Sequence, residues 1–358
     1  SRSQSITTGQ RFAGYDSSTV FHDINMNKKC VRLNLSKPEA IPLVKRLVGM
    51  ADVVAQNMRP GVLERLGLGY EALAEVKPDI IMLSSSAVGS TGPHRSYVGY
   101  APVFAALAGR APRTGAPRGN PVPLYGAVDL RSATTSAFAV LAALHQRATT
   151  GEGQHIDLSS VESIASLIGH LVTEYQLSGL VPKRRGNDDV EMAPHNAYPC
   201  RDGRWVSISA ANDREWEALC RVAGPRGWAE DPRFGTQRDR WRNRRALDRA
   251  VSEWTRDQAA TKVTELLQAA GVPALPCFDE EDLAHNPQLE ARGVFSTVHH
   301  EVLGDRDVLA PPWRLTGTPD VPQQPAPLLG EHSRYVLRDL LGLSEGKIEA
   351  LEAAEVVY

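Results

Sequence analysis

Apolar and polar positions follow two alternating periods along the first half of the chain. Residues 30–35 alternate like a strand, and residues 52–56 and 80–84 form short apolar runs. Helical spacing follows at 36–49, where Ser, Pro and Glu give a capping box, and again at 70–76. Strands that alternate with helices, some apolar on consecutive residues, are typical of a parallel sheet covered on both faces. The pattern therefore predicts an α/β fold with an open parallel sheet.

The same alternation continues in the middle of the chain. A long helix is predicted after Asp129, because the apolar residues that follow have the spacing of a buried helix face. We expect this helix to end before Gly151, and a strand at 155–158 and a helix at 161–177 to follow it. In such sheets, ligands bind beyond the carboxyl ends of the strands. The site is therefore expected where the predicted strands end.

The residue pattern changes between 181 and 199, where the chain becomes polar and shows no regular period. We place a domain boundary there, with a large domain over 1–185 and a small α+β domain over 186–312. Residues 313–358 are expected to contain the last two helices. In the small domain we expect a strand and three helices, at 204–209, 213–223, 244–256 and 258–270.

Composition narrows the classes of function. The chain has 358 residues, of which 42% are hydrophobic and 23% are charged, as in ordinary globular proteins. Its formal net charge of -2 gives no global preference for nucleic acid or an anionic membrane. The arginines at 238–245 are interspersed with acids, which favours a solvated helical face. The longest apolar run, at 137–144, is far shorter than the ~20 residues that a membrane span requires.

Cysteine usage points to a reducing compartment. The four cysteines are scattered without paired spacing: Cys30, Cys200, Cys220 and Cys277. This argues against a zinc site and against a disulfide framework. The sequence therefore predicts no bound metal and a cytoplasmic, soluble protein.

The common nucleotide and hydrolase motifs are absent from the sequence. There is no GxxxxGK[ST] loop, and no predicted strand runs into GxGxxG, which weakens nucleotide hydrolysis and hydride transfer. The segment 89–92 reads Gly-Ser-Thr-Gly, which is not the GxSxG turn of a serine hydrolase. The histidines are mostly isolated, as surface or hydrogen-bonded histidines are.

A turn with two cations follows the predicted strand at 52–56. Arg59, Pro60 and Gly61 form the turn, and Arg65 comes one helical turn later. One interpretation is ordinary turn chemistry with surface arginines. The other interpretation is a binding site for an anionic, phosphorylated ligand, since guanidinium groups bind phosphate well. The segment alone leaves both open.

Asp129 is the leading candidate for a reactive group. It stands between a small-residue turn, Tyr125-Gly126-Ala127-Val128, and the start of the predicted long helix. One interpretation is a helix N-cap, which stabilises a helix by about 1 kcal/mol. The other is a carboxylate aimed into a cleft, and a helix N-terminus also favours an anion. Position alone does not separate the two.

Together, these segments resemble the class III CoA-transferase family (CaiB/BaiF type), which includes formyl-CoA transferase, carnitine CoA-transferase and the α-methylacyl-CoA racemases. The match extends over almost the whole chain, in order and in spacing. The segments that carry it are 27–33, 37–39, 52–54, 57–61, 65–67, 89–93, 99–100, Asp129, 150–154, 198–203 and 329–332.

The resemblance implies a Rossmann-like large domain, C-terminal helices that return to it, and an interlocked homodimer. It places the family's catalytic aspartate on Asp129. The implied reaction moves CoA from an acyl-CoA donor to a carboxylic acid acceptor, through an aspartyl anhydride and an aspartyl-CoA thioester. A carboxylate that is already ionised needs no separate base for this attack.

The resemblance also assigns the remaining site residues, with coenzyme A as substrate and no metal. Asn57, Met58 and Arg65 match positions at the nucleotide end of CoA, with Leu33 beneath them. Tyr100 matches a family tyrosine near the reacting centre, so it joins Asp129 as a candidate catalytic residue. Arg59 is added to the CoA contacts from its charge and placement, not from the family pattern.

The sequence departs from the family pattern in two places. The family has an opening strand and helix that supply a glutamine to the site, and we expect either a truncated chain or a companion segment. The run of glycines found in formyl-CoA transferases is missing, which argues against formyl or oxalate substrates. The racemases place a histidine and an aspartate where this chain has Gly99-Tyr100-Ala101, with His94 the nearest histidine.

Three functions therefore remain to be compared. CoA transfer is the leading hypothesis. The first alternative is α-methylacyl-CoA racemization, and the second is a non-catalytic CoA-binding subunit.

Overall fold

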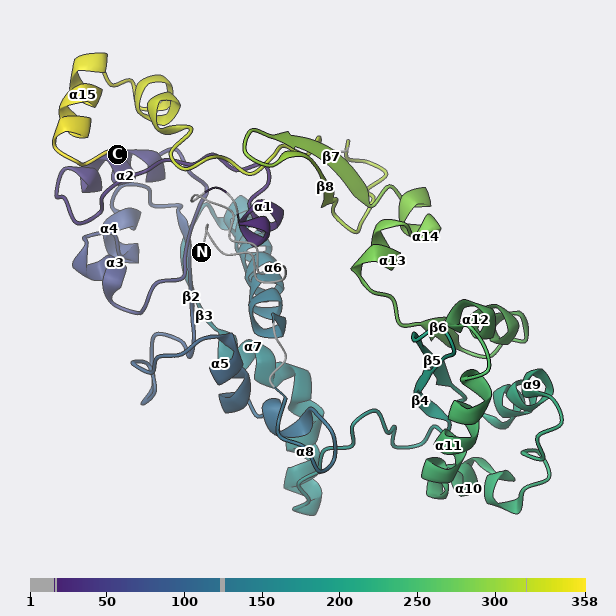
Figure 1. Ribbon diagram of the computed structural model, residues 1–358. Coiled ribbons are helices and arrows are strands. Elements are labelled where there is room, and N and C mark those ends of the chain that lie inside the picture. The colour runs from purple at the N-terminus through teal and green to yellow at the C-terminus, as the bar shows by residue number, and fades with distance from the viewer. Residues whose placement is uncertain (1–15, 17, 123–125, 320) are drawn as a thin grey trace. The chain divides into compact units, whose positions relative to one another are not determined.

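The computed structural model describes residues 16, 18–122, 126–319 and 321–358 (Figure 1). These residues form two compact units. The large unit takes the described residues up to 104, those from 126 to 167, and those from 285 onward. The small unit takes those from 105 to 122 and from 168 to 284. The predicted boundaries at 185/186 and 312/313 stay predictions.

The large unit is built on a sheet of three parallel strands. They are β1 (Val53–Gln56), β2 (Ile81–Ser86) and β3 (Gln154–Ser159), in the order β1-β2-β3. The residues of β2 from Ile81 to Leu83 are buried on both sides of the strand, as expected for a sheet covered on two faces. The predicted α/β class with a parallel sheet is confirmed.

Helices cover the two faces of this sheet (Figure 1). On one face, Ile80 and Met82 pack into a core cluster with residues of α2 (Ala40–Val48), α3 (Val62–Arg65) and α4 (Tyr70–Ala74). The long helix α6 (Ala127–Thr150) lies against β2 and β3 on the other side (Figure 1). The sheet edge beyond the strand ends is thus faced by the first turns of α6.

Arg147 fastens the end of α6 to the start of the sheet. Its guanidinium forms an ion pair with Asp52, with 2.7 Å between Nη2 and Oδ1. It also donates to the backbone carbonyls of Asp52 and Asp79, each at 3.2 Å. Both residues lie just before a strand. This one side chain therefore fixes the position of α6 along the direction of β1 and β2.

Two glycines make the connection from α6 to β3 possible. Gly151 ends the helix with φ +76°, a left-handed conformation that favours glycine. Gly153 passes so close to β2 that a Cβ atom there would lie 2.2 Å from the carbonyl oxygen of Ile80. Only glycine fits at this crossing.

A second core cluster in the large unit joins segments far apart in the sequence. Ala40 and Leu43 of α2 pack with Leu337, Ile348 and other C-terminal residues. Leu33 forms an antiparallel bridge to Val357. The other elements of this unit are α1 (Thr19–Ile24), α7 (Ser160–Ala165), α14 (Pro287–Ala291), the hairpin β7 (Phe295–His300) and β8 (Gly304–Leu309), a π-helix (Tyr335–Leu340) and α15 (Glu345–Ala353).

The small unit contains an antiparallel sheet with helices packed on it. The strands are β4 (His195–Pro199), β5 (Trp205–Ser209) and β6 (Ala274–Pro276), in the order β4-β5-β6. Its helices are α8 (Gly169–Ser178), α9 (Asp213–Ala223), α10 (Gln237–Arg242), α11 (Arg244–Thr255), α12 (Ala260–Ala269) and α13 (Glu280–Ala284). The helix α5 (Ala101–Leu107) begins in the large unit and ends in the first segment of the small unit. Short 3₁₀ turns occupy Ala111–Arg113, Ser166–Ile168 and Pro232–Phe234.

Arg240 is the largest fully buried side chain of the small unit. It donates to the carbonyls of Ala193 and Phe234, each at 3.2 Å, and pairs with Asp213 at 2.5 Å. A buried guanidinium is tolerated when its donors are paired in this way. The arginine that the sequence assigns to a solvated face therefore supports the core of this unit.

Three predicted elements differ in the structure. Residues 30–35 form only the single bridge at Leu33, because none of the strands that the structure describes runs beside them. The helix predicted at 161–177 is divided into α7 and α8 by a 3₁₀ turn. Ser36 does not cap α2, because its hydroxyl donates to Asn34 instead.

No helix among the described residues is long and apolar enough to cross a bilayer.

Candidate active site

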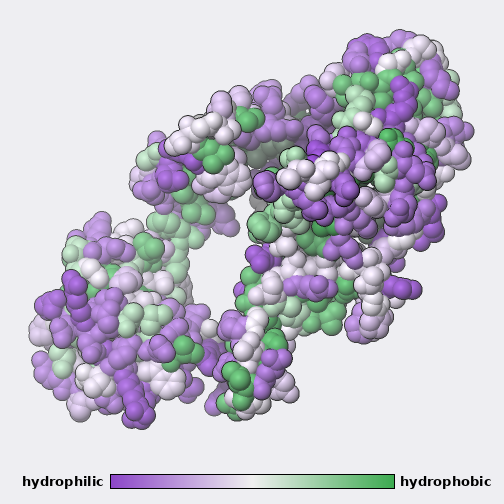
Figure 2. Space-filling model, turned by 180° about the vertical axis from the view of Figure 1, so that it is seen from behind, coloured by the Kyte–Doolittle hydropathy of each residue, from purple (hydrophilic) through white to green (hydrophobic). Residues whose placement is uncertain are grey.

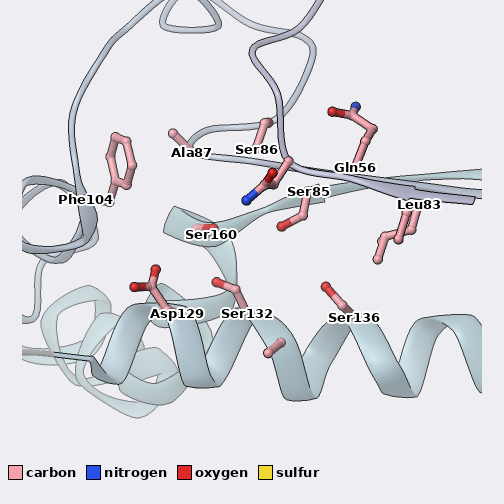
Figure 3. A pocket seen from close by; sticks show the side chains of 13 residues that line it. Gln56, Leu83, Ser85, Ser86, Ala87, Phe104, Asp129, Ser132, Ser136 and Ser160 are labelled. Atoms are coloured by element: carbon pink, nitrogen blue, oxygen red, sulfur yellow. The ribbon is translucent and has the colours of Figure 1, made fainter. Parts of the chain in front are cut away.

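Asp129 lies in the first turn of α6, and its side chain is exposed. The helix begins after Gly126, which has φ +74° and provides no side-chain cap. The interpretation of Asp129 as the N-cap is therefore wrong, because Gly126 occupies the N-cap position of α6. The carboxylate is left to face a cleft (Figure 3).

This cleft, which we call the Asp129 cleft, has a volume of about 480 Å³. It lies between the first turns of α6 and the carboxyl ends of β1 and β2, where open parallel sheets bind ligands. The residues lining it are Ala55, Gln56, Asn57, Leu83, Ser85, Ser86, Ala87, Phe104, Asp129, Ser132, Ala133, Ser136 and Ser160.

Hydroxyl groups dominate the walls around Asp129. Ser132 and Ser136 follow Asp129 at intervals of three and four residues, which places all three on one face of α6. Figure 3 shows their oxygens on the side of the helix that faces the sheet, with Ser85 and Ser160 opposite. Asp129 is the one charged side chain among the described residues that line this cleft.

A second cleft adjoins the first. It has a volume of about 630 Å³ and shares Asn57, Ser86, Ala87 and Phe104 with the Asp129 cleft. Its other lining residues are Met58, Arg59, Pro60, Arg65, Val88, Arg95, Ser96, Tyr97, Val98, Gly99 and Tyr100. We call it the arginine cleft, because three guanidinium groups line it.

The structure brings most of the predicted site residues together. Asn57, Met58, Arg59, Arg65 and Tyr100 all line the arginine cleft. Asp129 lines the adjoining cleft. Leu33 lies apart, packed against the cluster of α2 and the C-terminal helices. The roles assigned to these residues stay predictions.

Local geometry explains how the arginines reach this cleft. Gln56 ends β1 and accepts a hydrogen bond from the backbone N–H of Met58, at 2.6 Å, which turns the chain. Gly61 then adopts φ +84° and starts α3. This tight turn places Arg59 before the helix and Arg65 at its end, so both side chains meet the same space.

The loop after β2 is held by Asp157. The carboxylate of Asp157, near the end of β3, accepts from the backbone N–H of Ser90 at 3.0 and 3.1 Å and from the Ser90 hydroxyl. Gly89 precedes this contact with φ +85°. Because Val88 lines the arginine cleft, Asp157 fixes one wall of that cleft from outside it.

Sequence reasoning missed several lining residues. Arg95 adds a third cation, and its signal was present, since it follows the Gly-Ser-Thr-Gly-Pro segment at a strand end. Phe104 separates the two clefts, and Ser132 stands one helical turn beyond Asp129. The helical period gives the position of Ser132, but nothing in the sequence indicates that its hydroxyl lacks a partner.

His, Cys, Asp and Glu side chains are not clustered as metal ligands in the described part of the chain. No group of three or more His, Cys, Asp or Glu side chains there is arranged to hold a metal ion. His94 stacks on Tyr97, with ring centroids 4.3 Å apart, and it does not line the Asp129 cleft.

Comparison with known sequences defines the class of protein. The profile of CoA-transferase family III matches residues 5–333. The chain belongs to this family and is an enzyme of the CoA-transferase class, whose substrates are CoA thioesters.

Particular relatives and solved structures agree with this class. The succinyl-CoA–D-citramalate CoA-transferase of Chloroflexus aurantiacus is 36% identical over 92% of this chain and 83% of its own. Human succinyl-CoA:glutarate CoA-transferase is 29% identical over 98% and 80%. A CaiB/BaiF family protein from Brucella suis has a similar structure, with a TM-score of 0.84, 31% identity, and coverage of 90% of this chain and 84% of that one.

Proposed function

We propose that the chain moves CoA from an acyl-CoA donor to a carboxylate acceptor through covalent intermediates on Asp129. The observation that carries this proposal is the pair of adjoining clefts, one with three arginines and one with an exposed aspartate. CoA has the matching arrangement, with anionic phosphates at one end and a reactive thioester at the other.

The two clefts suggest how a CoA thioester lies. Its phosphates would pair with Arg59, Arg65 and Arg95, since guanidinium groups form charge-assisted hydrogen bonds to phosphate. The pantetheine arm would pass along the shared wall, where Asn57 offers an amide and Phe104 an apolar surface. The thioester carbon would then meet the Asp129 carboxylate.

The proposed reaction begins when a carboxylate oxygen of Asp129 attacks the thioester carbonyl carbon. The carbon–sulfur bond breaks, and the CoA thiolate leaves with the bonding pair, which gives an acyl-aspartyl anhydride. The thiolate next attacks the side-chain carbonyl of Asp129 and expels the donor carboxylate, which leaves an aspartyl-CoA thioester. The acceptor carboxylate repeats these steps in reverse and departs as the new CoA ester. The cycle consumes no net proton. Asp129 forms covalent intermediates as the carboxylate nucleophiles of other enzymes do.

The relatives suggest substrates to test. Their names give succinyl-CoA as donor in two cases and acetyl-CoA with oxalate in a third, from Acetobacter aceti, which is 34% identical over 90% of this chain and 82% of its own. We therefore propose succinyl-CoA as the first donor, with short dicarboxylates such as citramalate, malate and glutarate as acceptors.

We also propose that two chains interlock as a homodimer in the cytoplasm. Support comes from α6, where Leu130, Phe138 and Leu141 are each at least 65% exposed. Figure 2 shows apolar side chains lying open among polar ones on the surface. A 24-residue helix with bulky apolar residues in water is unfavourable unless another chain covers them. Light scattering after size exclusion tests this, and a monomer at micromolar concentration would contradict it.

Trapping the intermediate tests the mechanism. Incubation with succinyl-CoA and hydroxylamine should modify the peptide that contains Asp129, as seen by mass spectrometry. Asp129→Ala should abolish transfer while CoA still binds, because the phosphates and the pantetheine arm contact other residues. Asp257→Ala, on the exposed surface of the small unit, is the matched control. Normal turnover by Asp129→Ala would refute the mechanism.

The alternatives predict other outcomes. A racemase would exchange the α hydrogen of a 2-methylacyl-CoA with solvent deuterium and transfer no CoA. The described lining of the Asp129 cleft contains no histidine to serve as its base, which favours transfer. A non-catalytic subunit would bind CoA and show neither activity.

A further inference from the structure

Ser132 is an unusual residue of the Asp129 cleft. Ser132 is only 7% exposed, yet its hydroxyl has no hydrogen-bond partner among the residues that the structure describes. It lines the cleft one helical turn beyond Asp129. In Figure 3 the Ser132 oxygen lies on the same side of α6 as the Asp129 carboxylate. A buried donor without an acceptor is therefore held beside the reactive group.

The usual partner of a helical hydroxyl is not used here. Serine and threonine inside helices commonly donate to a carbonyl one turn earlier. Thr134 and Thr135 do so, with bonds to Leu130 and Arg131 of 2.8 to 3.1 Å. Ser132 donates to no carbonyl among the described residues. A buried unpaired hydroxyl is unfavourable unless a bound ligand accepts its hydrogen bond. The missing acceptor is expected to be part of the substrate.

We propose that Ser132 donates a hydrogen bond to the carbonyl oxygen of the acyl group that Asp129 attacks. This inference rests on the proposed transferase function and adds a catalytic residue to it. Side chains three residues apart on a helix have Cβ atoms about 5–6 Å apart. A carbonyl group bonded to the Asp129 oxygen lies within that interval, so its oxygen comes within reach of the Ser132 hydroxyl.

The hydroxyl acts without giving up its proton. When an Asp129 oxygen forms a bond to the carbonyl carbon, the carbonyl π pair moves onto oxygen and makes an oxyanion. Ser132 stabilises this charge through its O–H dipole. When the oxyanion collapses, the pair returns to the carbon–oxygen bond, and the carbon–sulfur pair leaves with the CoA sulfur. A donor aimed at a developing oxyanion stabilises the transition state more than the bound substrate.

Steady-state kinetics with succinyl-CoA separate this role from a structural one. Ser132→Ala should lower kcat by roughly 100-fold, as removal of one oxyanion donor does elsewhere, and change the KM for succinyl-CoA less than threefold. Its melting temperature should not fall, because the hydroxyl makes no hydrogen bond to any residue that the structure describes. Thr134→Ala removes a hydroxyl from the same helix that does not line the cleft, and it should retain full activity.

A vibrational measurement reads the hydrogen bond directly. Succinyl-CoA labelled with carbon-13 at the thioester carbonyl is bound to the Asp129→Ala protein, which cannot react with it. The carbonyl stretching band should lie lower than in water, and the Asp129→Ala/Ser132→Ala protein should lose that extra shift. Equal bands in both proteins, or wild-type kcat in Ser132→Ala, would overturn the proposal.

The outcomes also separate this inference from the proposed function. If the wild-type protein forms no Asp129 adduct and transfers no CoA, the proposed function fails and this inference falls with it. If the wild type transfers CoA and Asp129→Ala does not, but Ser132→Ala matches the wild type, only the role of Ser132 is refuted.

Discussion

Replacing Gly153 by alanine should strongly destabilise the large unit. The added Cβ would lie 2.2 Å from the Ile80 oxygen, 2.6 Å from the Asp79 carbonyl carbon and 2.7 Å from the Ile80 nitrogen. Non-bonded heavy atoms prefer separations of about 3.5 Å or more, so the overlap exceeds about 1 Å. All three atoms are backbone, and no side chain can rotate away.

The cost follows from what must move. β2 and β3 must separate at their first pair, Ile81 with Gln154, which loses a ladder hydrogen bond of about 1 kcal/mol. Strain from overpacking adds about 1–3 kcal/mol. We therefore expect the free energy of unfolding to fall by about 2–4 kcal/mol, and the melting temperature to fall by roughly 5–10 °C.

Scanning calorimetry and urea denaturation measure this change. Gly346→Ala is the matched control, because the same substitution in α15 meets no atom within 4 Å. It should leave stability unchanged or raise it by up to about 1 kcal/mol, since alanine favours helix. If Gly153→Ala melts at the wild-type temperature, the close crossing of β2 and β3 is refuted.

Three further predictions concern other contacts. Asp157→Ala releases the loop that it holds and should raise the KM for succinyl-CoA about 5- to 10-fold in steady-state assays, the effect of about 1 kcal/mol. Arg240→Leu leaves buried carbonyls without donors and should lower the urea stability of the small unit by roughly 3 kcal/mol. Burial, with His22 nearby, lowers the pKa of His300, so its contribution to stability is present above about pH 6.5 and is lost as the pH falls, which calorimetry between pH 8 and 5 detects.

Each of these has a control. Ser90→Ala removes a donor to Asp157 and should give a smaller change in KM, because the backbone N–H of residue 90 still binds. Arg238→Leu, on the exposed side of α10, should keep wild-type stability. His300→Gln should flatten the acid dependence. An unchanged KM in Asp157→Ala would contradict the role of Asp157. Equal stability of Arg240→Leu and Arg238→Leu would contradict the role of Arg240. A pH profile of His300→Gln identical to that of the wild type would contradict the role of His300.

Two strands of the large sheet, β1 and β2, were predictable because they are apolar on consecutive residues. β1 and β2 lie close to the runs predicted at 52–56 and 80–84, and in β2 the run matches a strand buried on both faces. Residues 30–35 have an alternating pattern but no adjacent strand in the described part of the chain. Alternation reports that one side of an extended segment is buried, and it does not report whether a partner strand exists.

The candidate site was predictable at its strand ends and less so beyond them. Arg59 and Arg65 follow β1 directly, so the rule for parallel sheets places them in a cleft. The hydroxyl of Ser132 is buried without a partner among the described residues, which no local sequence pattern records. The N-cap expected at Asp129 was wrong because Gly126, in a left-handed conformation, begins the helix three residues earlier.

The contact of residues 33–43 with the C-terminal helices sets the order in which the chain becomes folded during synthesis. Asn34 and Glu355 are hydrogen-bonded although 321 positions separate them. Ribosomes add about 5–20 residues per second, so roughly 15–60 s pass between the synthesis of α2 and that of the C-terminal residues that cover its apolar face. The core of the small unit comes from residues 193–274 alone and is complete well before then. A nascent chain at that stage presents one finished unit and one open hydrophobic face, which is the surface that chaperones bind.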